Sequence, residues 1–205
     1  IGRRLALKGL HASEVCLDGI LVNAATDLRA DPALDMDCVC LEGGLGATVL
    51  PANPHGTHTW RATFLGDVKL SHGKMQAADF RGSRIAGTLW LSGLRLSGSL
   101  WADLWDRFRT EVGKEIVLSG ARVDGDIELS AARIGGELHF ITGRCARLRA
   151  SVGAWAEPRK DGNGARTPRL CPTKASGILL QDLTVDAGVD LTGIKLRGQR
   201  KIFVE

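Results

Sequence analysis

The sequence predicts an all-β protein that winds as a parallel β-helix solenoid. Three observations lead to this fold class. A short apolar phrase recurs along most of the chain, a glycine recurs at a fixed place in that phrase, and the 205 residues include 26 glycines but no tyrosine. Many glycines indicate many tight turns, and a 44% hydrophobic content is sufficient for a buried core made mainly of aliphatic side chains.

The repeated phrase is clearest in residues 120–140. Its apolar, glycine, apolar, apolar quartet occurs twice at an interval of eleven residues, as Val123, Gly125, Ile127, Leu129 and as Ile134, Gly136, Leu138, Phe140. Looser copies begin at Leu5, Val15, Val39, Val68, Leu89, Ile116, Ile127, Leu138, Ile178 and Val189. Within each copy apolar residues alternate with polar ones, which predicts a very short strand.

Two other repeat architectures fit the pattern less well. An eleven-residue repeat also occurs in right-handed coiled coils, but a glycine in every repeat costs a helix about 1 kcal/mol each. Leucine-rich repeats are longer and carry an Asn or Cys ladder that this chain lacks. In a parallel β-helix each phrase supplies a strand and a corner, so we expect positive φ angles at Gly87, Gly98, Gly125 and Gly136.

Several phrases resemble the motif of the pentapeptide-repeat family, over about two thirds of the chain. Ala78 with Phe80 in AADFRG matches that motif, and two further pairs do so, Ala121 with Val123 and Ala132 with Ile134. The resemblance implies a right-handed β-helix of quadrilateral type. This chain departs from a strict five-residue repeat, because its steps alternate between five and six residues. Larger residues also fill every second small position, at Leu89, Ile127, Leu138 and Val189.

Two segments interrupt the winding of a single domain that spans residues 1–205. Residues 101–114 carry apolar side chains at helical spacing, which predicts an inserted short helix. Residues 149–175 are rich in Pro and Gly and lack periodicity, which predicts a long exposed loop. Further loops are expected near residues 23–37 and 47–61. The chain begins with Ile rather than Met and is expected to be a fragment of a longer protein.

The two insertions form the first candidate binding site, for another protein or an adjoining domain. The loop at 149–175 holds six basic residues against two acidic ones, while the whole chain has a net charge of +4. Such a loop fits an acidic partner, although a solvated loop has the same composition. The expected contact residues are Arg159, Lys160, Arg166 and Arg169 of the loop, together with Trp101, Trp105 and Phe108 of the expected helix.

Arginine residues precede several inward aliphatic residues and form the second candidate site, for nucleic acid. With a coil of 22 residues, Arg122 and Arg144 stack on one side, and Arg133 points out of the opposite side. A row of arginines binds phosphates. The structural alternative, which we favour, is that these side chains form ion pairs with nearby carboxylates. Family members that imitate DNA and bind type II topoisomerase need a strongly acidic surface, which this chain lacks.

The sequence contains none of the common catalytic, cofactor-binding or metal-binding motifs. An acidic row formed by Asp124, Asp126 and Glu128 resembles the carboxylates of carbohydrate-active β-helix enzymes, but such rows are common on solvated faces. Cys16 and Cys40 occupy equivalent places in two phrases and are expected on neighbouring coils. We therefore expect no cofactor and no metal.

The favoured hypothesis is a non-catalytic β-helical scaffold or protein-interaction module. The alternatives are a protein that binds nucleic acid or topoisomerase, and a carbohydrate-active enzyme. An odd number of cysteines argues against a disulfide framework and favours the cytoplasm. No apolar run is long enough to span a bilayer. Because a β-helix exposes strand edges at its ends, an end-to-end dimer is a further expectation.

Overall fold

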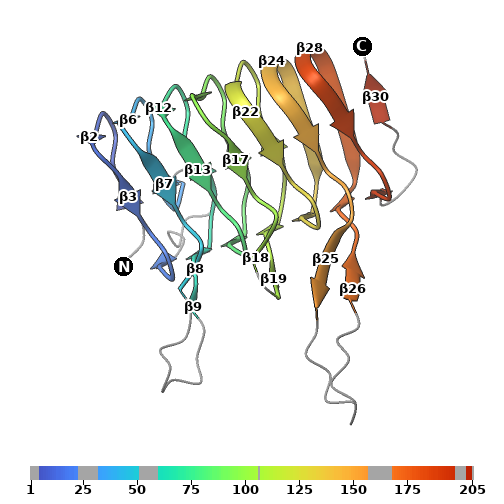
Figure 1. Cartoon of the computed structure of the whole chain (residues 1–205). Coiled ribbons are helices and arrows are strands. Elements are labelled where there is room, and N and C mark those ends of the chain that lie inside the picture. The colour runs from blue at the N-terminus through green and yellow to red at the C-terminus, as the bar shows by residue number, and fades with distance from the viewer. Residues whose placement is uncertain are drawn as a thin grey trace.

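The computed structural model describes residues 5–22, 32–50, 60–105, 107–156, 168–196 and 202–204. Every regular element in these ranges is a β-strand, and none of their residues forms a helix that could cross a membrane. The chain winds in successive coils along one axis, and each coil lies beside the previous one (Figure 1). The predicted parallel β-helix is therefore confirmed.

Parallel strand pairing arranges the described coils into four sides. Side 1 contains β1 (Leu5–Ala6), β5 (Leu34–Asp35), β11 (Val68–Lys69), β15 (Leu89–Trp90), β21 (Ile116–Val117), the first residues of β24 (Glu137–Arg149) and β28 (Gly177–Asp190), and β30 (Ile202–Val204). Side 2 contains β2 (His11–Ala12), β6 (Cys40–Leu41), β12 (Lys74–Met75), β16 (Arg95–Leu96), the start of β22 (Arg122–Glu128) and the middle of β24 and β28.

The other two sides complete each coil. Side 3 contains β3 (Val15–Cys16), β7 (Gly44–Gly46), β13 (Ala77–Asp79), β17 (Leu100–Trp101) and the ends of β22, β24 and β28. Side 4 contains β4 (Leu21–Val22), β10 (Thr63–Phe64), β14 (Arg84–Ile85), β20 (Glu111–Val112), β23 (Arg133–Ile134), β27 (Lys174–Ala175) and β29 (Lys195–Leu196). We number the coils 1 to 7 after the side-4 strands, in chain order.

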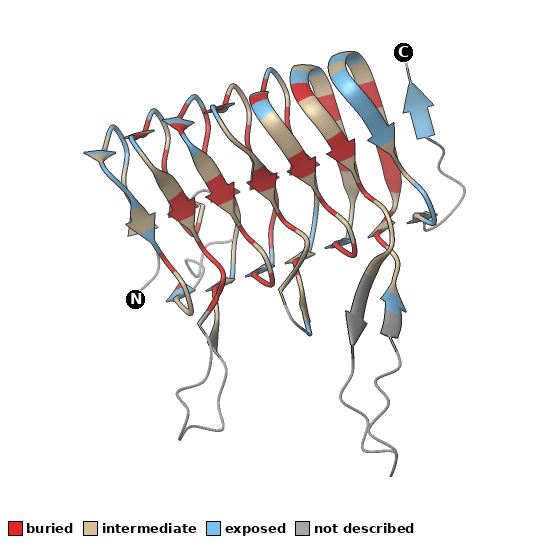
Figure 2. Cartoon of the chain, in the orientation of Figure 1, coloured by how far each residue is buried: buried red, intermediate tan, exposed pale blue. Residues whose placement is uncertain are grey.

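The core fills the inside of the coils with apolar side chains that stack in register. On side 3, for example, Ala78, Leu100 and Ile127 stack from coil to coil and are fully buried. Burial falls on the outer strands of the last coil and on β30 (Figure 2). Full burial of a large aliphatic side chain stabilises the fold by about 1.5–3 kcal/mol, so these stacks hold the coils together.

Two corners use left-handed backbone in several coils, and Gly188 adds a positive φ between sides 2 and 3 of coil 7. Between sides 1 and 2 each of the seven coils has one residue with positive φ: Gly9, Cys38, His72, Gly93, Gly120, Thr142 and Asp182. Between sides 3 and 4 coils 1, 3, 5 and 7 have one, at Gly19, Gly82, Ala131 and Gly193. The four glycines for which the sequence predicted positive φ are not among them, and that prediction was wrong.

Close backbone approach is the physical reason for those four glycines. A Cβ atom on Gly98 would lie 2.8 Å from the carbonyl oxygen of Gln76, and one on Gly136 would lie 3.0 Å from that of Lys114. Both positions turn a corner directly above the backbone of another coil, where a side chain has no space.

The helix predicted over residues 101–114 is absent, and strands take its place. Trp101 ends β17 on side 3, Val112 lies in β20 on side 4, and between them β18 (Leu104–Trp105) and β19 (Phe108–Arg109) form an antiparallel hairpin. The apolar residues have helical spacing because a hairpin inserted between the inward residues Leu100 and Val112 places its own apolar side chains at similar intervals.

Two further hairpins leave the solenoid. β8 (Val49–Leu50) pairs with β9 (Trp60–Arg61), where a loop was expected, and β25 (Gly153–Ala156) pairs with β26 (Pro168–Cys171). The segment 149–175, predicted to be a loop, therefore ends β24, forms a hairpin base and re-enters the solenoid at β27. Its residues 157–167 lie outside the described part of the chain.

Candidate functional site

All three hairpins leave the solenoid along one corner, between sides 3 and 4 (Figure 1). We call this corner the hairpin edge. The hairpins arise from coils 2, 4 and 6, whereas coils 1, 3, 5 and 7 close the same corner with a left-handed residue. Neighbouring hairpins are thus two strand spacings apart, or roughly 10 Å. An evenly spaced row of projections is the most distinctive surface feature of the molecule.

Two arginines tie the bases of the hairpins together. The Arg61 guanidinium donates hydrogen bonds to the carbonyl oxygens of Ser83, at 2.7 Å, and Arg109, at 2.8 Å. Arg109 in turn donates from Nε to the carbonyl oxygen of Ala131 and from Nη2 to that of Pro172, both at 2.7 Å. Each arginine therefore reaches from one hairpin, across the intervening coil, to the next hairpin.

Burial lowers the pKa of Arg61, and the nearby carboxylate of Glu111, 3.6 Å away, opposes that effect. The long planar guanidinium has several donors in fixed directions, which suits it to binding several carbonyl groups at once. These side chains hold the hairpin bases in place.

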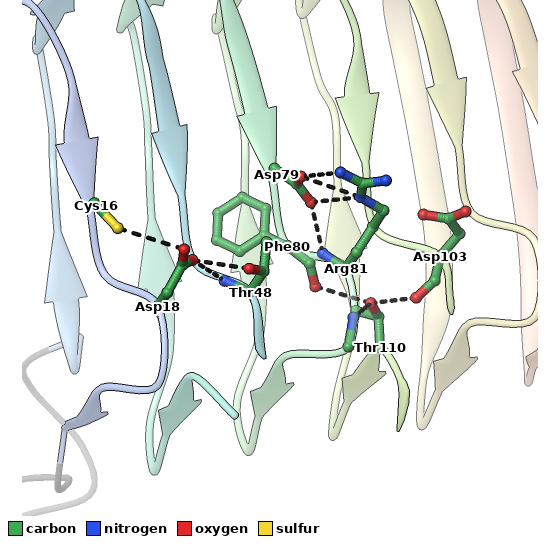
Figure 3. Close-up of polar contacts among 9 residues, drawn as sticks. Cys16, Asp18, Thr48, Asp79, Phe80, Arg81, Asp103 and Thr110 are labelled. Atoms are coloured by element: carbon green, nitrogen blue, oxygen red, sulfur yellow. Dashed lines mark hydrogen bonds and ion pairs between the residues drawn. The ribbon is translucent and has the colours of Figure 1, made fainter. Parts of the chain in front are cut away.

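A buried threonine completes the base of the middle hairpin. The Thr110 hydroxyl accepts a hydrogen bond from the Gly82 amide at 3.0 Å and lies 2.9 Å from the carbonyl oxygen of Phe80 and 2.7 Å from that of Asp103 (Figure 3). Thr173 has the same position in coil 6, where its hydroxyl lies near two carbonyl oxygens. Both residues satisfy backbone groups that the inserted hairpins leave outside the strand ladders.

The aromatic residues singled out from the sequence come together at this hairpin. The Arg81 guanidinium lies over the rings of Trp105, 4.5 Å from its centroid, and Trp101, at 5.5 Å. Hydrogen bonding to Asp79 raises the pKa of Arg81 and fixes the guanidinium in place. Phe108 lies near Arg107, at 5.3 Å. All three aromatic side chains are half-buried, and the two tryptophans are already engaged in cation–π contacts.

Asp103, which sequence reasoning did not single out, lies at the start of the same hairpin. Burial raises the pKa of its carboxyl to about 6, and its Oδ1 atom is buried without a hydrogen-bond partner within the described residues. Arg81 lowers this pKa, while Glu128 and Asp79 raise it further. A lone Asp in a polar stretch gives no sequence signal for such an environment, because the burial comes from the hairpin folding over coil 3.

A groove of about 310 Å³ separates the base of the β18–β19 hairpin from that of the β25–β26 hairpin. We call it the basic groove. It is lined by Arg107, Arg109, Leu170, Cys171, Pro172, Lys174 and Lys195. Four of these residues are basic, and no described residue in the lining is acidic. The segment that contains the predicted Arg169 forms one wall, while Arg159, Lys160 and Arg166 lie outside the described residues.

The arginine rows are arranged as the sequence predicted. Arg122 and Arg144 are in register on side 2, and Arg133 lies on side 4. Arg144 of this set forms an ion pair, with its Nη2 3.0 Å from Asp186 rather than from a carboxylate nearby in the sequence. Side 2 also contains Arg95, directly in register with Arg122.

Two of the three carboxylates of the acidic row form ion pairs with arginines. Asp126 lies 3.6 Å from Arg147, and Glu128 lies 3.5 Å from Arg149. Glu128 also accepts a hydrogen bond from the amide of Ser130, which leaves Asp124 as the exposed member of the row. Carboxylates held in this way are suited to stabilising neighbouring coils rather than to acid–base chemistry.

Cys16 and Cys40 lie on neighbouring coils, as expected, but not at equivalent places. Cys16 lies on side 3, in register with Gly46, whereas Cys40 lies on side 2, in register with His11. Positions in register on the first two coils are 29 residues apart, as for Leu5 and Leu34, whereas the two cysteines are 24 residues apart, so the second phrase lies on another side. Within the described residues no three His, Cys, Asp or Glu side chains are placed to hold a metal ion.

No protein-family model, no curated protein and no solved structure matches this chain.

Proposed function

We propose that this chain is a non-catalytic β-helical interaction module that binds an acidic segment of a partner protein in the basic groove. A kinship with pentapeptide-repeat proteins belongs to the same proposal, supported by the four-sided coil. Residence in the cytoplasm is supported by the five cysteines, all of which are free thiols.

The observation that carries the proposal is the basic lining of the groove. Arg107 and Lys195 line it together with Arg109 and Lys174, and its described lining contains no carboxylate. A concave surface with charges of one sign attracts ligands of opposite charge and raises their rate of association. Carboxylates on a flexible partner segment fit such a groove.

Rigidity of the groove supports the same conclusion. Arg109 links the two walls through its hydrogen bonds to Ala131 and Pro172, so the walls are held apart before a partner arrives. A preorganised surface loses less conformational entropy on binding. Trp101, Trp105 and Phe108 lie next to this wall, and half-buried aromatic and arginine side chains commonly dominate binding energy in interfaces.

Charge reversal in the groove tests the proposal. We expect the double variant Arg107→Glu with Lys195→Glu to bind a fluorescent oligoglutamate peptide at least tenfold more weakly than the wild type at low salt, measured by anisotropy. The matched control is Arg95→Glu with Arg122→Glu, which carries the same charge change on the opposite side 2. Equal affinity of the wild type and the groove variant for the peptide would refute the proposed site.

Shortening the third hairpin tests the contribution of Arg159, Lys160, Arg166 and Arg169, which the sequence predicted as contact residues. Replacing residues 155–169 by a short Gly-Ser turn retains Pro172 and Thr173, on which the hairpin base depends. The circular dichroism spectrum and the thermal midpoint should be unchanged while affinity for the peptide falls. If affinity is retained in this folded variant, Arg159, Lys160, Arg166 and Arg169 do not contribute to binding, because the replacement leaves all the lining residues of the basic groove in place.

A further inference from the structure

Side 2 carries a second basic surface, on the face of the solenoid opposite side 4. Lys74, Arg95, Arg122 and Arg144 follow one another in register on four consecutive coils. We call this column the basic ladder. Its four side chains are exposed and are separated by one strand spacing, about 4.8 Å each. Like charges directly opposite each other on neighbouring strands destabilise a sheet, so such a column needs an explanation beyond folding.

Most of the charge on the ladder is not neutralised by ion pairs among the described residues. Arg144 is paired with Asp186 at 3.0 Å. For Lys74, Arg95 and Arg122 the described part of the chain provides no ion pair. By contrast, the corresponding column on side 4 interposes Glu111 between two arginines and places it 3.9 Å from Arg84.

The ladder borders a shallow groove of about 370 Å³ that runs across coils 2 to 5. Gln76 and Ser97 line it beside the cations, two residues after Lys74 and Arg95, and provide further hydrogen-bond donors, while Glu42 and Asp124 line it on coils 2 and 5. Amide and hydroxyl donors interspersed with Lys and Arg are the groups that bind phosphate oxygens in protein–DNA interfaces.

The spacing and composition of the ladder favour a nucleic acid duplex over other polyanions. With both strands counted, a duplex carries one phosphate charge for each roughly 1.7 Å of its axis, so it offers more than one phosphate for each cation of a row spaced about 4.8 Å. An extended acidic peptide presents one same-face carboxylate for each roughly 6.6 Å, which is less than one for each cation. Single-strand binders stack bases on aromatic rings, and the described outward residues of side 2 include no Phe or Trp.

We infer that the basic ladder of side 2 binds the sugar–phosphate backbone of a duplex nucleic acid without reading its sequence. The inference is independent of the proposed function, because it uses a different side of the solenoid and a different set of residues. The phosphate contacts come from Lys74, Arg95 and Arg122. Arg144, which is paired with Asp186, extends the row by one coil.

Titration of the whole chain with a fluorescent DNA duplex at several salt concentrations tests the inference. Three neutralised phosphates predict a slope of about −2.7 in log affinity against log salt, or roughly a 40-fold loss of affinity between 50 and 200 mM salt. Two duplexes of unrelated sequence should bind equally. Absence of binding at the lowest salt, or a strong preference between the two sequences, would overturn the inference.

Matched variants locate the site. Arg95→Glu with Arg122→Glu should abolish duplex binding, and the milder Arg95→Gln with Arg122→Gln, which removes charge repulsion and preserves folding, should weaken it and make the salt slope shallower by about 2. Arg107→Glu with Lys195→Glu should bind the duplex as the wild type does. Retained binding in the ladder variants, or tighter binding of single-stranded DNA, heparin or oligoglutamate at the ladder, would contradict the assignment to a duplex.

Discussion

Gly87 illustrates, at the scale of one residue, why this fold needs so many glycines. A Cβ atom there would lie 2.6 Å from the backbone nitrogen of Asp67 in the preceding coil. The recurrence of glycine in the repeated phrase was visible in the sequence, but its cause was not. Strand stacking, rather than a left-handed turn, excludes a side chain at this corner, and the positive φ angles belong to other residues such as Gly93.

Asp103 leads to a prediction of how stability depends on pH. The pKa of its carboxyl is raised to about 6, so the folded state binds the proton more tightly than the unfolded chain does. Its contribution to stability is fully present below about pH 4 and is lost as the pH rises through 6. After allowance for partial solvent screening, we expect a loss of about 1 kcal/mol.

The comparison of the wild type with Asp103→Asn isolates this effect from that of other carboxylates. The variant should unfold at higher urea concentration than the wild type at pH 7 and at nearly the same concentration at pH 4. Asp124→Asn, which changes an exposed carboxylate, serves as the control. A constant difference between the wild type and Asp103→Asn from pH 4 to pH 7 would show that the carboxyl does not titrate in this range.

At the scale of elements, the inserted hairpin explains why the sequence wrongly predicted a helix over residues 101–114. Trp101, Trp105 and Phe108 have the spacing of one helix face, and the sequence alone gives no reason to divide them among three strands. The division follows from tertiary contacts. Arg81 of coil 3 lies over both tryptophans, and the β18–β19 hairpin therefore folds back over that coil.

Thr110 supports this hairpin, and its removal should be costly. We expect Thr110→Val, which keeps the shape but loses the hydroxyl, to lower the free energy of unfolding by about 1–3 kcal/mol, because the buried Gly82 amide loses its hydroxyl acceptor. Equilibrium urea unfolding measures the change. Thr184→Val, at an exposed position on side 2, should change stability by less than about 0.5 kcal/mol. Equal effects of the two substitutions would argue against the role of the hydroxyl.

At the scale of the whole molecule, the repeated phrase predicted the architecture and the opposite placement of Arg122 and Arg133. The first coil-to-coil step is 29 residues, from Leu5 to Leu34, whereas Cys16 and Cys40 are 24 residues apart, which is why they lie on different sides. The basic groove was not visible in the sequence, because its walls come from Arg107 and from residues more than 60 positions later, such as Cys171. Side-chain contacts across such separations have no local signature.

A coil in the middle of the stack should open only when its neighbours do. Cys145, fully buried in coil 6, has a thiol whose pKa is raised to about 11, mainly by burial. We expect iodoacetamide to modify the exposed Cys16 and Cys38 in the folded protein, while Cys145 reacts only at urea concentrations that unfold the solenoid. Mass spectrometry of peptides after brief labelling measures both. Rapid labelling of Cys145 without urea would mean that coil 6 opens locally.

The alternation of hairpin coils with closed coils also determines what the hairpins cannot do. At roughly 10 Å apart, the distance between the layers of a β-sandwich, adjacent hairpins can share side chains but cannot exchange backbone hydrogen bonds. Removal of the coil that Ala131 closes would bring the second and third hairpins to neighbouring-strand distance. The two hairpins would then form backbone hydrogen bonds with each other and make one continuous sheet. The space between them that holds the cationic side chains would disappear.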